Sequence, residues 1–310
     1  MIRTKPQRGL PLAGAMKFVN NYNRLSALLA TSLGEVFSSP RHRVEEAARY
    51  CLTAGGKRFR GVLSLAVADS LSLPLEQAMP FATAAECLHA ASLIHDDLPA
   101  LDNDDLRRGK PTCHRVYGEA AAILAGDILF AEALRIVSSA QGISAEARAG
   151  QAAELSNAFV QLCQGQDLDL LSSGSDPAQG KLSLEQIEDR HLRKTASLIR
   201  ACAVGPVYLL GTACNDKLKA TLSTYGTNLG LLFQVTDDVL DVTGTTEQLG
   251  KSAASDEATH TETFTTLLGV DGALDYARSV HKTIVSQLEE LDIDSQFLVG
   301  LADFALSRDR

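Results

Sequence analysis

The sequence predicts an all-α, single-domain bundle of about ten or more helices. Apolar residues recur with a period near 3.6 through almost all of the 310 residues, and alternating strand patterns are absent. Neither a linker nor a low-complexity segment marks a second domain, and a hydrophobic fraction of 45% is enough for one substantial core. We expect any ligand of such a bundle to bind between facing helices.

The helical period marks a series of stretches, and local signals support their ends. They are residues 17–38, 43–55, 58–71, 75–95, 118–139, 145–171, 183–204, 216–243 and 271–291. Ser72 precedes one of them, with a proline near the first turn. Ser183 and Gln186 form a capping-box pattern that opens another. We expect residues 1–16 to be a disordered tail and residues 17–310 to form the domain.

Composition and charge exclude several classes of function. With 38 acidic against 29 basic residues, the formal net charge of −9 argues against a nucleic-acid footprint and a polybasic membrane contact. The apolar stretch 201–214 is broken by Gly205-Pro206 and falls short of the roughly 18 residues that a membrane span needs. Six scattered cysteines without a Cys-x-x-Cys pair indicate reduced thiols. We therefore expect a cytoplasmic protein with no transmembrane segment.

Two aspartate-rich runs each follow an apolar helix that should not tolerate them. Their members are Asp96, Asp97 and Asp102, then Asp237, Asp238 and Asp241. Packed carboxylates repel one another and lose hydration, so they persist comfortably only with strong positive charge between them. Hard divalent cations, bound through carboxylates and substrate phosphates, supply that charge. The i, i+4 spacing of Asp237 and Asp241 places both carboxylates on one helix face.

Three basic clusters indicate anionic ligands, although each is a weak signal by itself. Lys57 and Arg60 follow two glycines that free backbone amides for an anion. A solvated loop is the simpler interpretation of Arg107 and Arg108, but beside a metal each arginine can grip a phosphate. Lys194 interrupts an otherwise apolar helix.

Together these features predict a site for a diphosphate. Several cations and three basic clusters imply more anionic oxygen than one phosphate supplies, and an apolar bundle behind them can hold a greasy tail. The expected reaction is departure of the diphosphate, because metals stabilise the leaving charge and a dry pocket protects a cation from water. His95-Asp96 also fits a metal-dependent phosphohydrolase, but the further histidine ligands of that class have no recognisable spacing here.

Several segments carry a family resemblance. They are residues 92–114, Gly118-Glu119, residues 124–127, Lys194-Thr195 and residues 233–241. In these segments, and from about Tyr50 to its end, the chain resembles the trans-isoprenyl diphosphate synthases, which include farnesyl and geranylgeranyl diphosphate synthases. A terpene cyclase shares the first aspartate motif but usually carries an Asn/Ser/Glu-type second one. The resemblance implies an isoprenoid-synthase fold with a central prenyl-binding cavity, and a homodimer.

The resemblance also implies roles for individual residues. Three aspartates would bind three Mg²⁺ ions, with Mn²⁺ as an alternative, and three would support them: Asp96, Asp102 and Asp237, then Asp97, Asp238 and Asp241. The allylic diphosphate (dimethylallyl, geranyl or farnesyl) would be held by Arg107, Lys194 and Lys251. The diphosphate of isopentenyl diphosphate would be held by Lys57, Arg60, His89 and Arg108. The carbocation region, where the ionised allylic group meets the isopentenyl double bond, would be lined by Thr195 and Gln234.

Two positions depart from the family pattern. Thr261 occupies the place of a lysine that usually contacts the allylic diphosphate, and Glu262 adds a negative charge beside it. We therefore expect weaker allylic binding. Gly61 occupies the place of a proline that usually follows Arg60.

The expected product length depends on the residue five before the first aspartate, which forms the pocket floor in this family. Here it is Ala91, with Leu88 and Cys87 one turn lower. Alanine leaves room beneath, so we expect mainly geranylgeranyl diphosphate, with Leu88 or a neighbouring helix as the floor. Two alternatives stay open: a farnesyl diphosphate synthase, and a non-catalytic prenyl-diphosphate-binding partner subunit, which only Thr261 supports.

Overall fold

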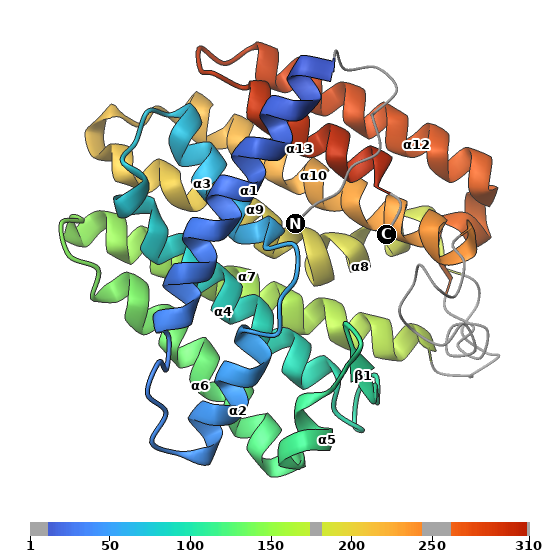
Figure 1. The fold of residues 1–310 in the computed structure, drawn as a ribbon. Helices are drawn as coiled ribbons and strands as arrows, with labels where there is room; N and C mark the ends of the chain where they lie inside the picture. Colours follow the sequence, from blue (N-terminus) through green and yellow to red (C-terminus); the bar gives the residue numbers. More distant parts are fainter. Residues whose placement is uncertain (1–11, 174–181, 244–261, 309–310) are drawn as a thin grey trace.

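The computed structural model describes residues 12–173, 182–243 and 262–308, and this part is a helical bundle with one short hairpin (Figure 1). Its first half contains α1 (Leu12–Glu35), α2 (Arg43–Leu52), α3 (Phe59–Ser70), α4 (Leu75–Asp96), α5 (Cys113–Tyr117), α6 (Glu119–Ser138) and α7 (Ala145–Ser173). Its second half contains α8 (Leu184–His191), the π-helix η1 (Leu192–Ala196), α9 (Ser197–Val204), the 3₁₀-helix η2 (Gly205–Ala213), α10 (Asp216–Thr243), α12 (Phe264–Glu289) and α13 (Gln296–Ser307). The predicted all-α class is confirmed.

The predicted stretches are helical, although some of their ends differ, and α5, η2 and α13 lie outside them. α1 already begins at Leu12, so the predicted tail of residues 1–16 is too long, and residues 1–11 lie outside the described part. α12 begins at Phe264, ahead of the predicted start at residue 271. The capping box that opens α8 is present, since the Ser183 hydroxyl accepts from the N–H of Gln186.

A hairpin occupies a region for which the sequence predicts only a charged loop. β1 (Leu106–Arg107) pairs antiparallel with β2 (Lys110–Pro111). Arg108 and Gly109 connect them with φ angles of 54° and 74°, as in a type I′ turn, whose central residues both have positive φ. Strands this short carry no alternating pattern, which is why the sequence analysis missed them.

α4 is the buried centre of the bundle and carries the first aspartate motif at its end. Most of its side chains from Ala78 to Ile94 are buried, and many of them are alanines, which allow close helix packing. α4 contacts α7, α7 contacts η1, and η1 contacts α10 (Figure 1). This series of contacts connects the two helices that end in the aspartate motifs.

One helical run in the described part, Leu184–Ala213, is long and apolar enough to cross a membrane by length and composition. In the sequence, Gly205-Pro206 predicts an interruption that leaves the stretch too short for a membrane span. In the structure the interruption only changes α9 into the 3₁₀-helix η2. The apolar window of the run is 61% buried inside the bundle, so it is a core helix here.

Candidate active site

The first aspartate motif turns back on itself at the carboxyl end of α4. The N–H of Asp102 donates to the backbone carbonyl of Asp96 over 2.8 Å, which returns Asp102 to the helix end as its spacing predicts. Burial raises the pKa of Asp96 to about 7, with Lys194 opposing the shift and Asp102 adding to it. The Asp96 carboxylate is therefore costly to ionise unless more positive charge arrives.

Asp97 differs from Asp96 because the hairpin holds its carboxylate. Arg107 of β1 donates through Nε to Asp97 over 2.6 Å and also pairs with Asp104 at 3.3 Å. Burial raises the pKa of Asp97, and the hydrogen bond from Arg107 opposes that rise. The structure thus joins two predicted site residues to each other, while their roles toward metal and diphosphate stay predictions.

Two residues of α7 enter the site that the sequence analysis did not select. Gln166 donates through Nε2 to Asp102 over 3.0 Å, and Asp169 forms an ion pair with Lys194. The two residues are three apart and share one face of the helix. The signal that could have found them is the polar run Gln166-Asp-Leu-Asp169 near the end of a predicted helix.

η1 presents Lys194-Thr195 from a widened π-helical turn, a feature that often marks functional positions. Two glycines let the neighbouring helices close on it. A β-carbon at Gly165 of α7 would lie 2.2 Å from the backbone nitrogen of Lys194. A β-carbon at Gly230 of α10 would lie 2.4 Å from the Cα of Ala196. Both contacts need a residue without a side chain.

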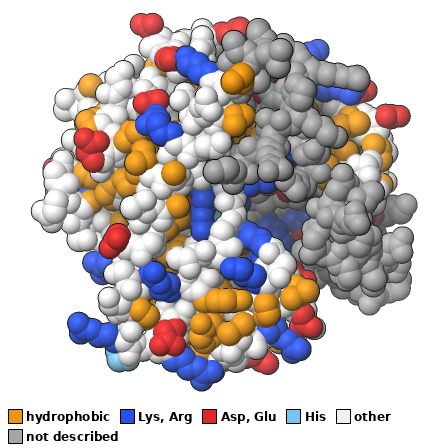
Figure 2. Space-filling view, in the orientation of Figure 1, with side chains coloured by type: hydrophobic (Ala, Val, Ile, Leu, Met, Phe, Trp, Pro, Cys, Tyr) orange, Lys and Arg blue, Asp and Glu red, His pale blue; other side chains and the backbone are white. Residues whose placement is uncertain are grey.

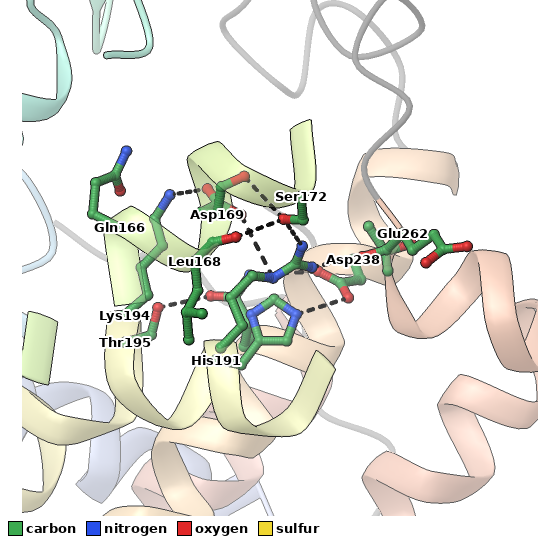
Figure 3. Close-up of polar contacts among 12 residues, drawn as sticks. Gln166, Leu168, Asp169, Ser172, His191, Lys194, Thr195, Asp238 and Glu262 are labelled. Carbon is green, nitrogen blue, oxygen red and sulfur yellow. Dashed lines mark hydrogen bonds and ion pairs between the residues drawn. The ribbon is translucent and has the colours of Figure 1, made fainter. Parts of the chain in front are cut away.

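The polar side chains of η1 connect α7 with α10. Figure 3 shows Lys194 directed toward Asp169, the partner of its ion pair. Thr195 donates through its hydroxyl to the Oε1 of Gln234 over 2.9 Å. The structure therefore brings together the two residues predicted to line the carbocation region.

Asp238 of the second motif is buried and serves as a tie between helices. Its Oδ2 accepts from the N–H of Phe264 over 2.9 Å, at the start of α12. His191 stacks on the Phe264 ring with 5.6 Å between centroids. His191 also lies 3.5 Å from Asp238, and Figure 3 shows these two side chains facing each other. These contacts fix α10 against α8 and α12, and the predicted metal role of Asp238 stays a prediction.

Asp237 and Asp241 are more accessible. The Asp237 side chain is 36% exposed, and its Oδ1 lies 2.7 Å from Nη2 of Arg308, which follows α13. Asp241 is exposed one turn further along α10. No sequence signal could have found Arg308, because only the tertiary fold brings the end of the chain to this motif.

Glu262 makes structural contacts beside the site. Its carboxylate accepts from the N–H of Leu182, and its carbonyl accepts from Arg190 over 2.6 Å. Arg190 also lies 3.5 Å from Asp169, which places Glu262 at the edge of the Lys194 network (Figure 3). Thr261 and Lys251, both singled out from the sequence, lie outside the described residues.

A basic pocket lies between α2, α4 and the hairpin, and Asp97 of the first aspartate motif and its partner Arg107 form part of its wall. It has an empty volume of about 520 Å³, and its lining includes His89, Arg107 and Arg108. Arg60 donates to Nε2 of His89 over 3.2 Å. Burial, followed by the charges of Arg60 and Arg108, lowers the pKa of His89 well below its usual range, so its imidazole is neutral. Figure 2 shows Lys and Arg side chains gathered where this face is hollowed.

The two glycines before Lys57 make room for Arg108. Arg108 donates to the carbonyl of Gly55, and a β-carbon at Gly56 would lie 2.6 Å from its Nη1. Lys57 lies over the Phe304 ring, with its ammonium 5.5 Å from the centroid. The hairpin turn and the start of α3 thus supply cations to the same region.

The structure explains Gly61, which departs from the family pattern. Its N–H donates to Oε1 of buried Glu86 over 3.0 Å, and a proline would remove this donor. A β-carbon at Gly61 would also lie 2.3 Å from Cδ2 of Leu29 in α1. Glycine therefore permits the close approach of α1 to α3.

The carboxylates fit Mg²⁺ that is shared with a diphosphate. Within the described ranges, no group of three or more His, Cys, Asp or Glu side chains is close enough to hold a metal ion. Mg²⁺ is commonly bound by one or two carboxylates together with phosphate oxygens, so it does not need such a group. Asp96 receives no side-chain hydrogen bond from the described residues, and Asp237 is partly exposed. Both can therefore supply oxygen ligands.

The residues predicted to set product length lie in the core part of α4. Ala91, Leu88 and Cys87 are fully buried. Burial raises the pKa of the Cys87 thiol, and Glu132 of α6 adds to the shift, which places Cys87 near that helix. The structure puts all three below the first aspartate motif, and their effect on product length stays a prediction.

Comparison with known proteins identifies the family. The polyprenyl synthetase family model matches residues 41–296. A geranylgeranyl pyrophosphate synthase of Capsicum annuum is 42% identical over 272 residues, which cover 86% of this chain and 72% of the relative. The geranylgeranyl pyrophosphate synthetase of Pyrococcus horikoshii has a TM-score of 0.82 at 29% identity, with 94% of this chain and 98% of that chain covered.

A second solved structure bears on the ligands. A geranyltransferase of Helicobacter pylori, complexed with magnesium and isoprenyl diphosphate, has a TM-score of 0.78 at 29% identity, covering 99% of this chain and 98% of its own. The match of the family model spans well over half of the 310 residues. The chain therefore belongs to the polyprenyl synthetase family, as a trans-prenyltransferase that uses Mg²⁺ and diphosphate substrates.

Proposed function

We propose that this prenyltransferase condenses isopentenyl diphosphate with an allylic diphosphate, and that its main product is geranylgeranyl diphosphate. The observation that carries the proposal is the presence, on one face, of two regions that suit a diphosphate: an acidic one that would gather divalent cations around Lys194, and a basic one. One is centred on Lys194 and the aspartates. The other is the pocket around His89 and Arg108. Two diphosphates need two such regions, whereas a hydrolase of one phosphate ester needs only one.

The first region suits the allylic diphosphate. Mg²⁺ ions held by Asp96, Asp102 and Asp237 would supply positive charge to the leaving diphosphate. Lys194 adds a cation from η1, and Asp169 holds its side chain in place. Thr195 and Gln234 offer paired polar oxygens to the developing carbocation. The buried apolar side chains beneath exclude water that would otherwise capture this cation.

The second region suits isopentenyl diphosphate. Arg60 and Arg108 place positive charge beside His89. The neutral imidazole of His89 can donate one hydrogen bond while it accepts another. The Nε of Arg60 is buried without a partner among the described residues, so it has a donor to spare. The new double bond forms when the condensed cation loses a proton, and the departing diphosphate would accept that proton.

Ala91 and the relatives support the twenty-carbon product. Ala91 is small and lies just below the first motif, and the Capsicum relative bears the name of a geranylgeranyl pyrophosphate synthase. Ala91→Phe would fill the space beneath the substrate and should shorten the product. Leu88→Ala should lengthen it if Leu88 is the floor. An unchanged product distribution in both variants would refute this assignment.

Product analysis tests the proposal. The purified protein receives labelled isopentenyl diphosphate, Mg²⁺ and, in turn, dimethylallyl, geranyl or farnesyl diphosphate, and the dephosphorylated products are sized by chromatography. Geranylgeraniol as the main product supports the proposal. Farnesol supports the alternative, a farnesyl diphosphate synthase. Absence of product with every primer supports a non-catalytic partner subunit.

We also propose a homodimer formed by the apolar face of α6 and α7. Ile123 and Leu124 of α6 and Val160 of α7 are large, apolar and about half exposed. The helices α6 and α7 contact each other, and large exposed apolar side chains favour a protein partner. A second copy of this chain is the partner that the family leads us to expect. Ile123→Asp should give monomers in light scattering after gel filtration, whereas Leu28→Asp, on exposed α1, should not. A wild-type monomer would overturn the proposal.

We further propose a cytoplasmic location, because all six cysteines are free thiols in the structure. Cell fractionation tests it, and recovery of the protein in a membrane or secreted fraction would contradict it.

A further inference from the structure

The last described residue, Arg308, enters the second aspartate motif from the end of the chain. Its side chain is 3% exposed. Nη2 lies 2.7 Å from Oδ1 of Asp237 and also donates to the backbone carbonyl of Phe233. Arg308 thus contacts α10 at two points one helical turn apart.

An aromatic cluster holds this guanidinium in position. Its Cζ lies 3.6 Å from the centroid of the Phe233 ring, a close cation–π contact. Phe233 packs on Phe59 at 5.4 Å between centroids, and Phe59 packs on Phe304 of α13 at 6.4 Å. α13 is therefore anchored by the same rings that Arg308 covers. A side chain fixed in this way loses little further freedom when it pairs with a carboxylate.

The ion pair uses an oxygen that a metal would also use. The Asp237 side chain is 36% exposed, and Arg308 balances the charge of its carboxylate. A divalent cation and a guanidinium cannot both approach one carboxylate oxygen closely, because like charges repel. By contrast, Asp96 has no arginine or lysine within ion-pair distance among the described residues.

We propose that Arg308 is an internal counter-ion of Asp237 that a divalent cation must displace, so that the end of the chain sets the metal affinity of the second aspartate motif. This inference rests on the proposed metal-binding role of Asp237. It makes Arg308 a positioning residue, which balances the charge of Asp237 and keeps its side chain ordered before metal arrives. It also links metal loading to displacement of the Arg308 side chain.

The test is a titration of the full-length protein with Mn²⁺ in the presence of inorganic diphosphate, with free Mn²⁺ measured by electron paramagnetic resonance. Arg308→Gln should lower the half-saturating Mn²⁺ concentration about three- to tenfold, the effect of removing one charge-assisted contact. Arg308→Lys keeps the charge without the planar fork and should fall between Arg308→Gln and wild type. Because Arg308 is buried, thermal melting checks that each variant folds, and the lysine variant carries the test if the glutamine variant does not.

Two further variants make the result specific. Arg278→Gln removes an ion pair of the same 2.7 Å length with Asp275 on exposed α12, and should leave the Mn²⁺ titration unchanged. Asp237→Asn should weaken Mn²⁺ binding, and if it does not, the proposed metal role of Asp237 fails. If Asp237→Asn weakens binding but Arg308→Gln leaves it equal to wild type, the counter-ion proposal alone is overturned.

A second titration separates the counter-ion from a diphosphate ligand. Inorganic diphosphate without metal is titrated into wild type and Arg308→Gln by calorimetry. Equal affinities agree with the proposal. Clearly weaker diphosphate binding by Arg308→Gln, together with weaker Mn²⁺ binding, would overturn it and make Arg308 a ligand of the diphosphate.

Discussion

The two aspartate motifs are similar in sequence, but the fold holds them in different ways. At the end of α4, Asp102 folds back on Asp96 through the backbone, and Asp97 pairs with Arg107 of the adjacent hairpin. At the end of α10, Asp238 is held by Phe264 and His191, and Asp237 is held by Arg308. The first motif is therefore organised mainly by its own neighbourhood, and the second by distant helices. Substitutions in the first motif should therefore affect mainly the reaction, and substitutions in the second motif should affect both the reaction and the stability of the fold.

Asp96→Asn should give the largest effect and separates chemistry from folding at the first motif. We expect kcat to fall about 10²- to 10³-fold, because a metal-held negative charge that stabilises the leaving group is lost. The melting temperature of the metal-free protein should not fall, since no described side chain donates a hydrogen bond to Asp96. Steady-state kinetics and thermal melting measure the two quantities. Asp105→Asn, on the exposed loop nearby, is the control and should change neither. A folded variant with near wild-type kcat would show that Asp96 does not serve the metal.

Asp238→Ala should have the opposite profile at the second motif. It removes the acceptor for the Phe264 N–H in the core, and a buried unsatisfied donor costs about 1–3 kcal/mol. Urea denaturation of the metal-free protein measures this loss. Asp292→Ala removes an exposed carboxylate between α12 and α13 and should change the free energy of unfolding by only about 0.5 kcal/mol. Equal, small changes in both variants would remove the contrast between the motifs.

This contrast also explains what the sequence could predict. Most of the helices and both aspartate runs are local patterns that the sequence predicts, but the predicted stretches do not include α13. Gln166 and Asp169 carry a weak local signal on α7 that was overlooked. Arg308 has no local signal, because its importance depends entirely on where α13 packs. The hairpin and the early start of α12 were missed for a related reason: two-residue strands have no periodicity, and the start of α12 is fixed by the contact with Asp238.

The pH dependence of metal-free stability should sharpen the comparison further. The pKa of Asp96 is raised from 3.8 to about 7 in the folded protein, so the folded state binds its proton more tightly than the unfolded state. The stabilisation is complete below the unfolded pKa and is lost as pH rises through about 7. In a chelator, wild type should therefore lose stability relative to Asp96→Asn between pH 4 and pH 7. If the melting temperatures of the two proteins change in parallel with pH over that range, the burial of the Asp96 carboxylate is contradicted.

Thr261→Lys should give the smallest effect and tests whether the region that binds the allylic diphosphate lacks a cation. The variant restores the lysine that the family usually has, and one new charge-assisted contact should lower the KM for the allylic substrate about three- to tenfold. Glu262 should not cancel this gain, because its carboxylate already accepts from the N–H of Leu182. kcat should change little, since Lys194 and the aspartates are untouched. Thr283→Lys adds the same charge on the exposed face of α12 and is the control for a general electrostatic effect. If both lysines leave the allylic KM at its wild-type value, the two motifs already supply sufficient charge, and Thr261 is a neutral departure from the family pattern.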